Sequence, residues 1–289
     1  ITASYQNTYT MNYTRKEDRP PFGFQIGLPH TVPSDFLDAT GNDNTFTLSS
    51  GIMFTRQLDS VINYSYAINK RYSNASNQNT AVTFPDITLS ILEAEKWVGL
   101  GNIISGSRIN TGFQKSYRAS GNIDWDQPKQ ETVSYALNPL IGFAGTLFKK
   151  VSTNLSFSMM NSTNTTDMET YDIVKLTSSY SLNGNISYSF KGGRGFTVPF
   201  TKKKIHINNE LTSSLAFVFE KNLDDTTGRE GNHQIDRDTT RLAFTPGASY
   251  QFNQDIRGGL TGTYEITSDK RRDDGLRTFR LGVWVEINL

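Results

Sequence analysis

The sequence has no cysteine among its 289 residues, so a fold held together by disulfides is excluded. A net charge is almost absent as well, because 29 Lys and Arg residues oppose 28 Asp and Glu residues and leave a formal charge of +1. This balance gives no reason to expect a nucleic-acid partner. No apolar run approaches the ~20 residues that a membrane-spanning helix needs, and no cleavable signal peptide is recognisable. The chain begins at Ile1 rather than Met, which indicates a processed or partial chain.

Hydrophobic residues are few for a chain of this length. They make up 36% of it, and the mean hydropathy of −0.48 would by itself favour a soluble protein. The 13 Tyr and 18 Phe residues point the other way, because their placement along the chain is regular. Fold class therefore has to be argued from the order of the residues rather than from composition.

Apolar and polar residues alternate along most of the chain. In the opening stretch "ITASYQNTYTMNYT" the odd positions are mostly apolar or aromatic and the even ones are Thr, Ser, Gln and Asn; the closing stretch "RTFRLGVWVEINL" repeats the pattern. A period of two is typical of a β-strand with one apolar and one polar face. We count about twelve such segments, many longer than the ~5–6 residues usual in soluble sheets. A phase slip is expected between Ile173 and Tyr180.

The polar positions decide which side of the strands meets water. The outward faces of a soluble sandwich are rich in charge, whereas here the polar positions are mostly Thr, Ser, Asn, Gly and Gln, and the charges gather in the connections. This favours a water-filled interior and an apolar face turned to lipid. The sequence thus predicts an all-β fold, a transmembrane antiparallel β-barrel of about twelve strands or a segment of a much larger one, with no separate soluble domain. A secreted soluble β-sandwich or β-helix is the alternative.

Aromatic residues near the strand ends are expected to form the interfacial girdles of such a barrel. They are Tyr13, Tyr117, Tyr188, Phe190, Phe219, Tyr250 and Phe252.

The connections are predicted to alternate in length. Tight links at residues 57–60, 149–150 and 253–255 interleave with long polar ones at 15–44, 72–81, 120–129, 161–169, 221–238 and 268–276. Outer-membrane barrels have short periplasmic turns and longer external loops, so the predicted location is the bacterial outer membrane with both termini periplasmic. Two periplasmic links are less tight: "KGGRGFTVPFTKKK" at 191–204, and residues 92–104, where "LEAEKWVGLG" is expected to form one amphipathic helical turn.

Proline and glycine interrupt several strand segments. Pro139 and Pro246 remove hydrogen-bond donors and are interpreted as bulges or entry points near a barrel rim. Gly residues inside strands are expected at bends or close contacts in the wall. They are Gly112, Gly145, Gly184, Gly247, Gly258, Gly259, Gly262 and Gly282.

The residues that could carry chemistry are scattered. His30, His206 and His233 each lack a second ligand at metal spacing, and Asn208 stands where a phospholipase-type barrel would want a Ser. Acidic residues cluster in one predicted external loop, where weak calcium binding is less favoured than simple solvation; they are Asp224, Asp225, Glu230, Asp236 and Asp238. The stretch 191–195, "KGGRG", lacks the ending of a phosphate loop, and the lysines at 202–204 suit a membrane rim. The sequence predicts no catalytic, cofactor or metal site and no enzyme.

Several stretches resemble the C-terminal part of the SprA/Sov family. They include "FPDITLSILEAEKWVGLG" from residue 84, "LNPLIGF" from residue 137, and "FTPGASYQFNQDIRGG" from residue 244, and the similarity extends over roughly residues 82–289. Members of that family are the very large outer-membrane translocons of type IX secretion, associated with gliding motility in the Bacteroidetes. The motifs are strand-like rather than catalytic, so the resemblance implies wall and rim positions and no functional side chains.

The resemblance implies a protein-conducting outer-membrane pore whose wall is passive and polar. Partners would be outer-membrane lipid, other barrel segments or subunits of a secretion complex, periplasmic and plug proteins, and the secreted cargo. Family members are several times longer than this chain and form one very wide barrel, whereas a closed barrel of about twelve strands admits only small solutes or one extended segment. An independent small porin or an autotransporter-like translocator is therefore the alternative function.

Overall fold

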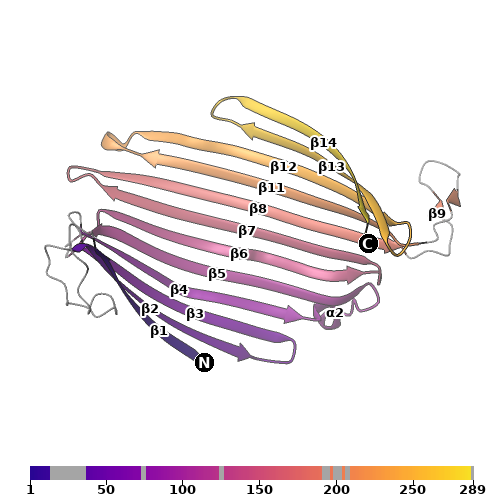
Figure 1. The fold of residues 1–289 in the computed structure, drawn as a ribbon, viewed down its shortest axis with the longest axis horizontal. Helices are drawn as coiled ribbons and strands as arrows, with labels where there is room; N and C mark the ends of the chain where they lie inside the picture. Colours follow the sequence, from indigo (N-terminus) through magenta and orange to yellow (C-terminus); the bar gives the residue numbers. More distant parts are fainter. Residues whose placement is uncertain are drawn as a thin grey trace.

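A computed structural model of the chain describes residues 1–13, 37–72, 76–123, 127–190, 196–197, 204–205 and 209–287. Its main feature is one antiparallel sheet of twelve strands in which neighbours in space are neighbours along the chain, apart from a small hairpin inserted between β8 and β11. Figure 1 shows the sheet as a single broad layer crossed by long, roughly aligned strands.

The strands of the main sheet are longer than those of most soluble proteins. They are β1 (Thr2–Tyr13), β2 (Leu37–Met53), β3 (Leu58–Tyr72), β4 (Asn77–Leu92), β5 (Ile104–Asn122), β6 (Gln130–Leu147), β7 (Val151–Asp167), β8 (Asp172–Phe190), β11 (Leu211–Thr227), β12 (His233–Gln251), β13 (Ile256–Asp269) and β14 (Asp274–Ile287). The small hairpin pairs β9 (Phe196–Thr197) with β10 (Lys204–Ile205). The helical elements are α2 (Ala94–Trp97) and the short 3-10 turn η2 (Arg229–Gly231).

The described part of the chain has almost no interior. Its buried hydrophobic residues are three alanines, Ala94, Ala119 and Ala243, and none of its large side chains is fully buried. No helix in this part of the chain is long and apolar enough to cross a membrane. The hydrophobic effect that normally drives folding has no protein core to act on here.

Strand pairing places the apolar residues of neighbouring strands on the same face of the sheet. Paired residues point to the same side, and successive residues along a strand point to opposite sides. Phe219, for example, pairs with Leu182 on β8 and with Leu242 on β12. Following such pairs from β1 to β14 defines an apolar face and a polar face. The apolar face includes Tyr5, Phe46, Tyr64, Ile87, Ile109, Phe113, Phe143, Leu155, Phe157, Leu182, Ile186, Leu215, Phe217, Phe244, Leu260, Phe279, Leu281 and Val283.

The apolar residues form a belt rather than covering their whole face. On β11 they run from Leu211 to Phe219, after which Lys221 and Asp225 occupy the same face. Nine residues is about the length with which a tilted strand crosses the hydrocarbon layer of a bilayer. The belt lies against the end of the sheet that holds the β2–β3, β4–β5, β6–β7 and β12–β13 connections, here named the turn end. At the opposite end, the loop end, the strands are polar on both faces.

Strand length corrects the prediction of long polar loops. Residues 221–227 and 233–238 were expected in a loop but continue β11 and β12 as a paired hairpin, so that the connection is only 228–232. Likewise β7 extends to Asp167 and β13 to Asp269, and β2 already begins at Leu37. Backbone pairing across the hairpins satisfies donors and acceptors even where no hydrophobic pattern marks a strand. The tight links predicted at 149–150 and 253–255 are confirmed within the connections 148–150 and 252–255. The link predicted at 57–60 lies at 54–57 instead, because β3 already begins at Leu58.

Two further expectations are wrong in part. The phase slip in the segment after Tyr171 is absent, because β7 and β8 pair in a single register from Val151↔Tyr188 to Asp167↔Asp172. Pro246 lies in an unshifted register opposite Leu215 and forms no bulge. The predicted bulge at Pro139 is confirmed, since the β6–β7 register shifts between Leu137 and Ile141, although it lies in mid-strand rather than near the rim.

The predicted all-β fold class is confirmed: the described chain forms one antiparallel sheet of twelve strands. The sheet is open. β1 and β14 are each paired on one side only, so they form the two edges of the sheet.

Candidate functional site: the polar face

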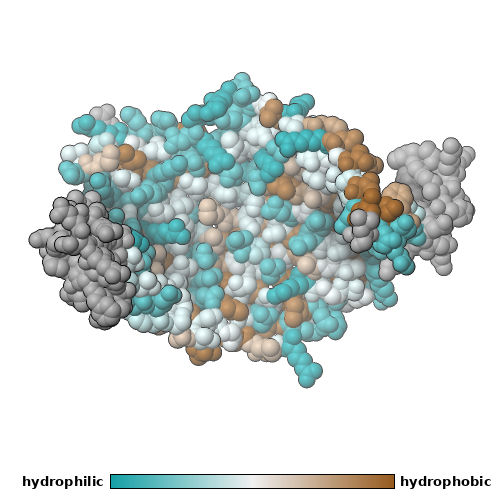
Figure 2. All heavy atoms as spheres, viewed as in Figure 1, coloured by the Kyte–Doolittle hydropathy of each residue, from teal (hydrophilic) through white to brown (hydrophobic). Residues whose placement is uncertain are grey.

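The centre of the polar face is a neutral surface of hydroxyl and amide groups. On β7 and β8, side chains pointing to this face are almost all Ser, Asn and Thr, as in Ser156, Ser158, Ser181, Asn183 and Asn185. Figure 2 shows one side of the sheet, on which hydrophilic and near-neutral side chains predominate over its middle part. Such a surface offers hydrogen bonds to whatever passes without strong electrostatic attraction to one charge.

Cross-strand hydrogen bonds hold part of this surface in place. The Ser134 and Ser162 hydroxyls lie 2.8 Å apart, and the Asn164 amide donates to the Thr132 hydroxyl at 2.8 Å. Ser158 donates to the Asn138 side-chain oxygen at 3.0 Å. Because these partners belong to the neighbouring strands β6 and β7, the contacts order the side chains and leave their remaining hydrogen-bonding capacity open.

Charges return on the C-terminal strands. Arg241 on β12 donates to Glu220 on β11 at 3.2 Å and to Glu265 on β13 at 3.0 Å. The three side chains therefore form a row across neighbouring strands on the polar face. They are about one-third to two-fifths exposed, so solvent screening leaves each pair only a small contribution to stability. Their stronger effect is to fix one cation between two anions at a defined height on the wall.

Two other ion pairs lie towards the loop end. Arg71 lies 3.6 Å from Asp43 across β3 and β2, and Lys175 lies 3.2 Å from Asp224 across β8 and β11. Both join adjacent strands in the region where the apolar belt has ended. They therefore stabilise hairpins that extend beyond the belt.

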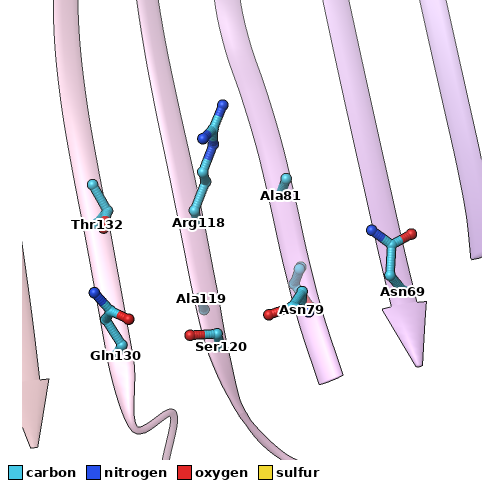
Figure 3. A pocket seen from close by; sticks show the side chains of 9 residues that line it. Asn69, Asn79, Ala81, Arg118, Ala119, Ser120, Gln130 and Thr132 are labelled. Carbon is cyan, nitrogen blue, oxygen red and sulfur yellow. The ribbon is translucent and has the colours of Figure 1, made fainter. Parts of the chain in front are cut away.

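A groove of about 400 Å³ hollows the polar face near the loop end of β3 to β6. Figure 3 shows Arg118 on β5 between Ala81 on β4 and Thr132 on β6, with Asn69, Asn79, Ser120 and Gln130 nearer the strand ends. Ala81 pairs directly with Arg118, so its small side chain leaves room beside the guanidinium. Arg118 is exposed, and the neighbouring groups are neutral. The groove can accept a polar or anionic solute group, but it contains no set of residues for covalent chemistry.

The residues that the sequence singled out for possible chemistry are not brought together as a metal site. Asp224 pairs with Lys175, Asp225 lies 3.6 Å from His233, and Asp236 accepts a hydrogen bond from Thr226. Within the described ranges, no group of three or more His, Cys, Asp or Glu side chains could hold a metal ion. Several candidates lie outside the described residues: His30, His206, Asn208, the side chains of Glu230 and Lys204, the stretch 191–195 and the lysines at 202–203.

The predicted girdle residues lie where a membrane boundary would be. Tyr188, Phe190 and Tyr250 are on the apolar face at the turn end, and Phe252 follows in the adjoining connection, its ring 5.1 Å from that of Tyr250. On the same face, Tyr117 marks the other border of the belt, where its hydroxyl donates to Glu131 at 2.8 Å. Phe219 also lies at that border. The side chain of Tyr13 is outside the described part.

Sequence reasoning missed the Glu220–Arg241–Glu265 row and the groove beside Arg118. Each of these residues lies at a polar position of an alternating strand. This position was the only feature of the sequence that could have indicated a place on the polar face. Which of them meet depends on strand register, and register places Arg241 between residues about 20 positions away along the chain in both directions.

No protein-family model matches the chain, and no curated protein matches it. Similar solved structures include the copper transporter OprC, with 8% identity over 86% of this chain, a TM-score of 0.32 and 57% of that protein covered. Another is the translocator domain of the autotransporter NalP from Neisseria meningitidis, with 12% identity over 86% of this chain, a TM-score of 0.26 and 80% of that domain covered. This chain thus spans little more than half the length of OprC. Similarity at this level indicates neither a shared ligand nor a shared mechanism.

Proposed function

We propose that this chain forms part of the wall of a protein-conducting pore in the bacterial outer membrane, and that the pore is of the SprA/Sov type. The wall is a passive conduit: its polar face lines a water-filled passage and its apolar face meets lipid, while energy and gating come from other components. The observation that carries the proposal is the belt of large apolar side chains on one face of a single-layer sheet, with no protein packed over it in the described chain.

The exposed apolar belt favours lipid over a soluble fold. Leu215, Leu260 and Val283 on this face are 38%, 51% and 73% exposed, whereas soluble monomers rarely expose continuous apolar patches of more than a few hundred Å². A belt of about nine residues along each strand is also the length that a tilted membrane strand requires. The hairpins at the loop end, largely polar on both faces, would then project into water, which supports an orientation with the turn end at the periplasmic surface.

The polar face favours transport over catalysis. A surface of Ser, Thr and Asn side chains binds a transported molecule only weakly. Weak binding allows that molecule to leave each position and move on. The Arg118 groove and the row of Arg241 with Glu220 and Glu265 add charges at defined places, and neither forms a nucleophile–base pair or a pair of catalytic acids. We therefore propose no enzymatic step.

The open edges favour a part of a wider wall over a small closed pore. β1 and β14 present unpaired backbone groups along their outer sides, and in lipid such edges must pair with other strands. A wider barrel would supply those strands and also the lumen that a folded or bulky cargo needs. The resemblance of residues 82–289 to the SprA/Sov family supports the same assignment.

The mass of the intact particle tests the proposal. The protein would be extracted from membranes in mild detergent and weighed by native mass spectrometry or light scattering. The expected result is a particle much heavier than this chain of 32.4 kDa. A stable, conducting particle that contains only this chain would overturn the large-translocon assignment and favour an independent small barrel, whose two edge strands pair with each other.

A further inference from the structure

The connection between β4 and β5, residues 93–103, lies at the turn end of the sheet. It contains the helical turn α2, as expected from the sequence "LEAEKWVGLG". Figure 1 shows it at the end of the sheet, below the ends of β4 and β5. Its structure depends on a buried carboxylate.

Glu95 is 5% exposed and lies against a bulge at the start of β5. Its carboxylate accepts hydrogen bonds from the backbone N–H groups of Gly106 at 3.0 Å and Ser107 at 3.1 Å, and from the Ser107 hydroxyl. The Glu95 backbone N–H in turn donates to the Ser107 hydroxyl oxygen at 3.1 Å. Three donors on one carboxylate, two of them fixed backbone groups, clamp the helical turn onto the sheet.

The clamp lies on the apolar side of the sheet. Gly145 belongs to the apolar face, because it pairs with Thr153, two residues from Leu155 on that face. A Cβ added at Gly145 would lie 3.5 Å from the Ser107 Cβ. Ser107 therefore projects on the apolar side, and Glu95 contacts it there. The connection thus continues the apolar face at the turn end, where the belt reaches the end of the strands.

The outer surface of the connection is apolar. Trp97, Val98, Leu100 and Ile103 are 51%, 66%, 40% and 43% exposed, and Phe148 in the next tight turn is 64% exposed. Lys149 and Lys150 follow Phe148 and are exposed. Exposed apolar and aromatic groups beside lysines are typical of segments at the boundary between headgroups and acyl chains.

Several polar groups of the connection have partners within the protein. The Trp97 indole N–H donates to the Gln57 side-chain oxygen at 2.8 Å, and Lys96 pairs with Glu93 at 2.5 Å. Backbone N–H groups of Glu93, Lys96, Leu100, Ile103 and Ile104 donate to backbone oxygens of Ser107, Glu93, Glu95 and Leu100. A loop that faces only water needs no such internal pairing, whereas a loop that enters a lipid boundary does.

We propose that residues 93–103 form an interfacial anchor, held by Glu95, that inserts Trp97 and its apolar neighbours into the headgroup–acyl boundary of the leaflet on the turn side. This rests on the proposed function, because it takes the apolar face to be the lipid face. Lipid is favoured over a protein partner because the exposed apolar surface of the connection is continuous with the belt.

Tryptophan fluorescence tests the anchor directly, because the chain contains only Trp97, Trp125 and Trp284. The double variant Trp125→Phe/Trp284→Phe of the full chain would be reconstituted in phosphatidylcholine vesicles that carry bromine near the headgroup or near the acyl end. We expect Trp97 to be quenched at least about twofold more by shallow than by deep bromine. Equal absence of quenching by both, or stronger quenching by deep bromine, would overturn the anchor.

Two reference positions separate this inference from the proposed function. Trp284 points to the polar face and, as the single tryptophan, should be quenched by neither lipid. Leu155→Trp, in a background with all three native tryptophans changed to Phe, should be quenched most by deep bromine, because Leu155 lies in the middle of the belt. Quenching of Leu155→Trp without quenching of Trp97 would refute the anchor alone; no quenching at either position would refute the lipid face and the anchor with it.

The Glu95→Gln variant tests the clamp. Its amide nitrogen cannot accept the hydrogen bonds that the second carboxylate oxygen accepts, so the helical turn should loosen and Trp97 should lose its preference for shallow bromine. Glu169→Gln, at an exposed acid in the β7–β8 connection, is the matched control and should leave the preference unchanged. If Trp97 keeps its preference for shallow bromine in Glu95→Gln, Glu95 does not hold the anchor in place.

Discussion

Ile186 and Asn185 are neighbours on β8 whose side chains point to opposite faces in the middle of the belt. Arginine in place of Ile186 would put a charge into hydrocarbon, and we expect it to cost about 2–4 kcal/mol of folding free energy in vesicles. Arginine in place of Asn185 would meet water and should cost much less. Urea titration of both variants in lipid vesicles measures the difference, and equal costs on the two faces would contradict the assignment of the faces.

Arg241 is the single cation between Glu220 and Glu265. Arg241→Gln would remove the ion-pair partner of both carboxylates on the polar face, while stability should change little because the pairs are partly exposed. We expect the reconstituted pore to shift towards cation selectivity, measured as the reversal potential in a salt gradient. Glu220→Gln, which leaves one ion pair intact, should shift it less; no shift in either variant would place this row outside the conducting path.

Glu95 gives the anchor a dependence on pH. The hydrogen bond from the Ser107 hydroxyl lowers the pKa of Glu95 below its ordinary value, and the Lys96 ammonium, followed by the Gln57 amide, lowers the pKa of the adjacent Glu93. A lowered pKa in the folded state means that the stabilisation is fully present above the ordinary glutamate pKa and is lost as pH falls through the lowered one. In the variant that keeps only Trp97, the emission maximum should therefore shift to the red in that acidic window. In Glu95→Gln the shift should be reduced.

Close contacts on the apolar face show why one glycine is required there. A Cβ added at Gly184 would lie 2.1 Å from the ring of Phe217, the residue opposite it on β11, and 2.9 Å from Leu155. The Phe217 ring occupies the space that a side chain at position 184 would need. The sequence predicted a close contact at Gly184 from its position inside a strand, but only the register identifies Phe217 as the residue in contact.

At the scale of the element, the hairpin of β11 and β12 has two unlike halves. Residues 211–219 and 242–250 belong to the apolar belt, whereas 220–227 and 233–241 are largely polar and extend beyond it. Alternation predicted the first half as strand and left the second as a loop, because a segment that is polar on both faces has no period of two to detect. Pairing with β8 and between the two strands, unseen in the sequence, makes the second half a strand.

This division predicts which part of the hairpin can be shortened. Replacing residues 225–236 with Asn-Gly joins Asp224 to Arg237 through a tight turn of a type that suits hairpins. We expect the shortened protein to insert into vesicles as the full chain does, because the belt is intact. Leu215→Ser/Phe217→Ser in the same hairpin should impair insertion. Protease protection of the inserted protein measures both, and impaired insertion of the shortened form would show that the polar half contributes to the membrane-embedded wall.

At the scale of the molecule, the chain is one layer with two edges. The sequence predicted the class, the approximate number of strands and the two faces, because all three follow from alternation within each strand. The open edges and the groove beside Arg118 depend on which strands pair and in which register, so neither could be read from local pattern. Ala81 is an example, because its small side chain leaves space beside Arg118 only when β4 pairs with β5 in this register.

The near-absence of buried side chains in the described chain bears on how the protein folds. On the proposed function, its hydrophobic stabilisation is realised only when a bilayer receives the apolar belt. We therefore expect the chain to stay unfolded until insertion, and its stability afterwards to depend on protein and membrane together, rising or falling with bilayer thickness.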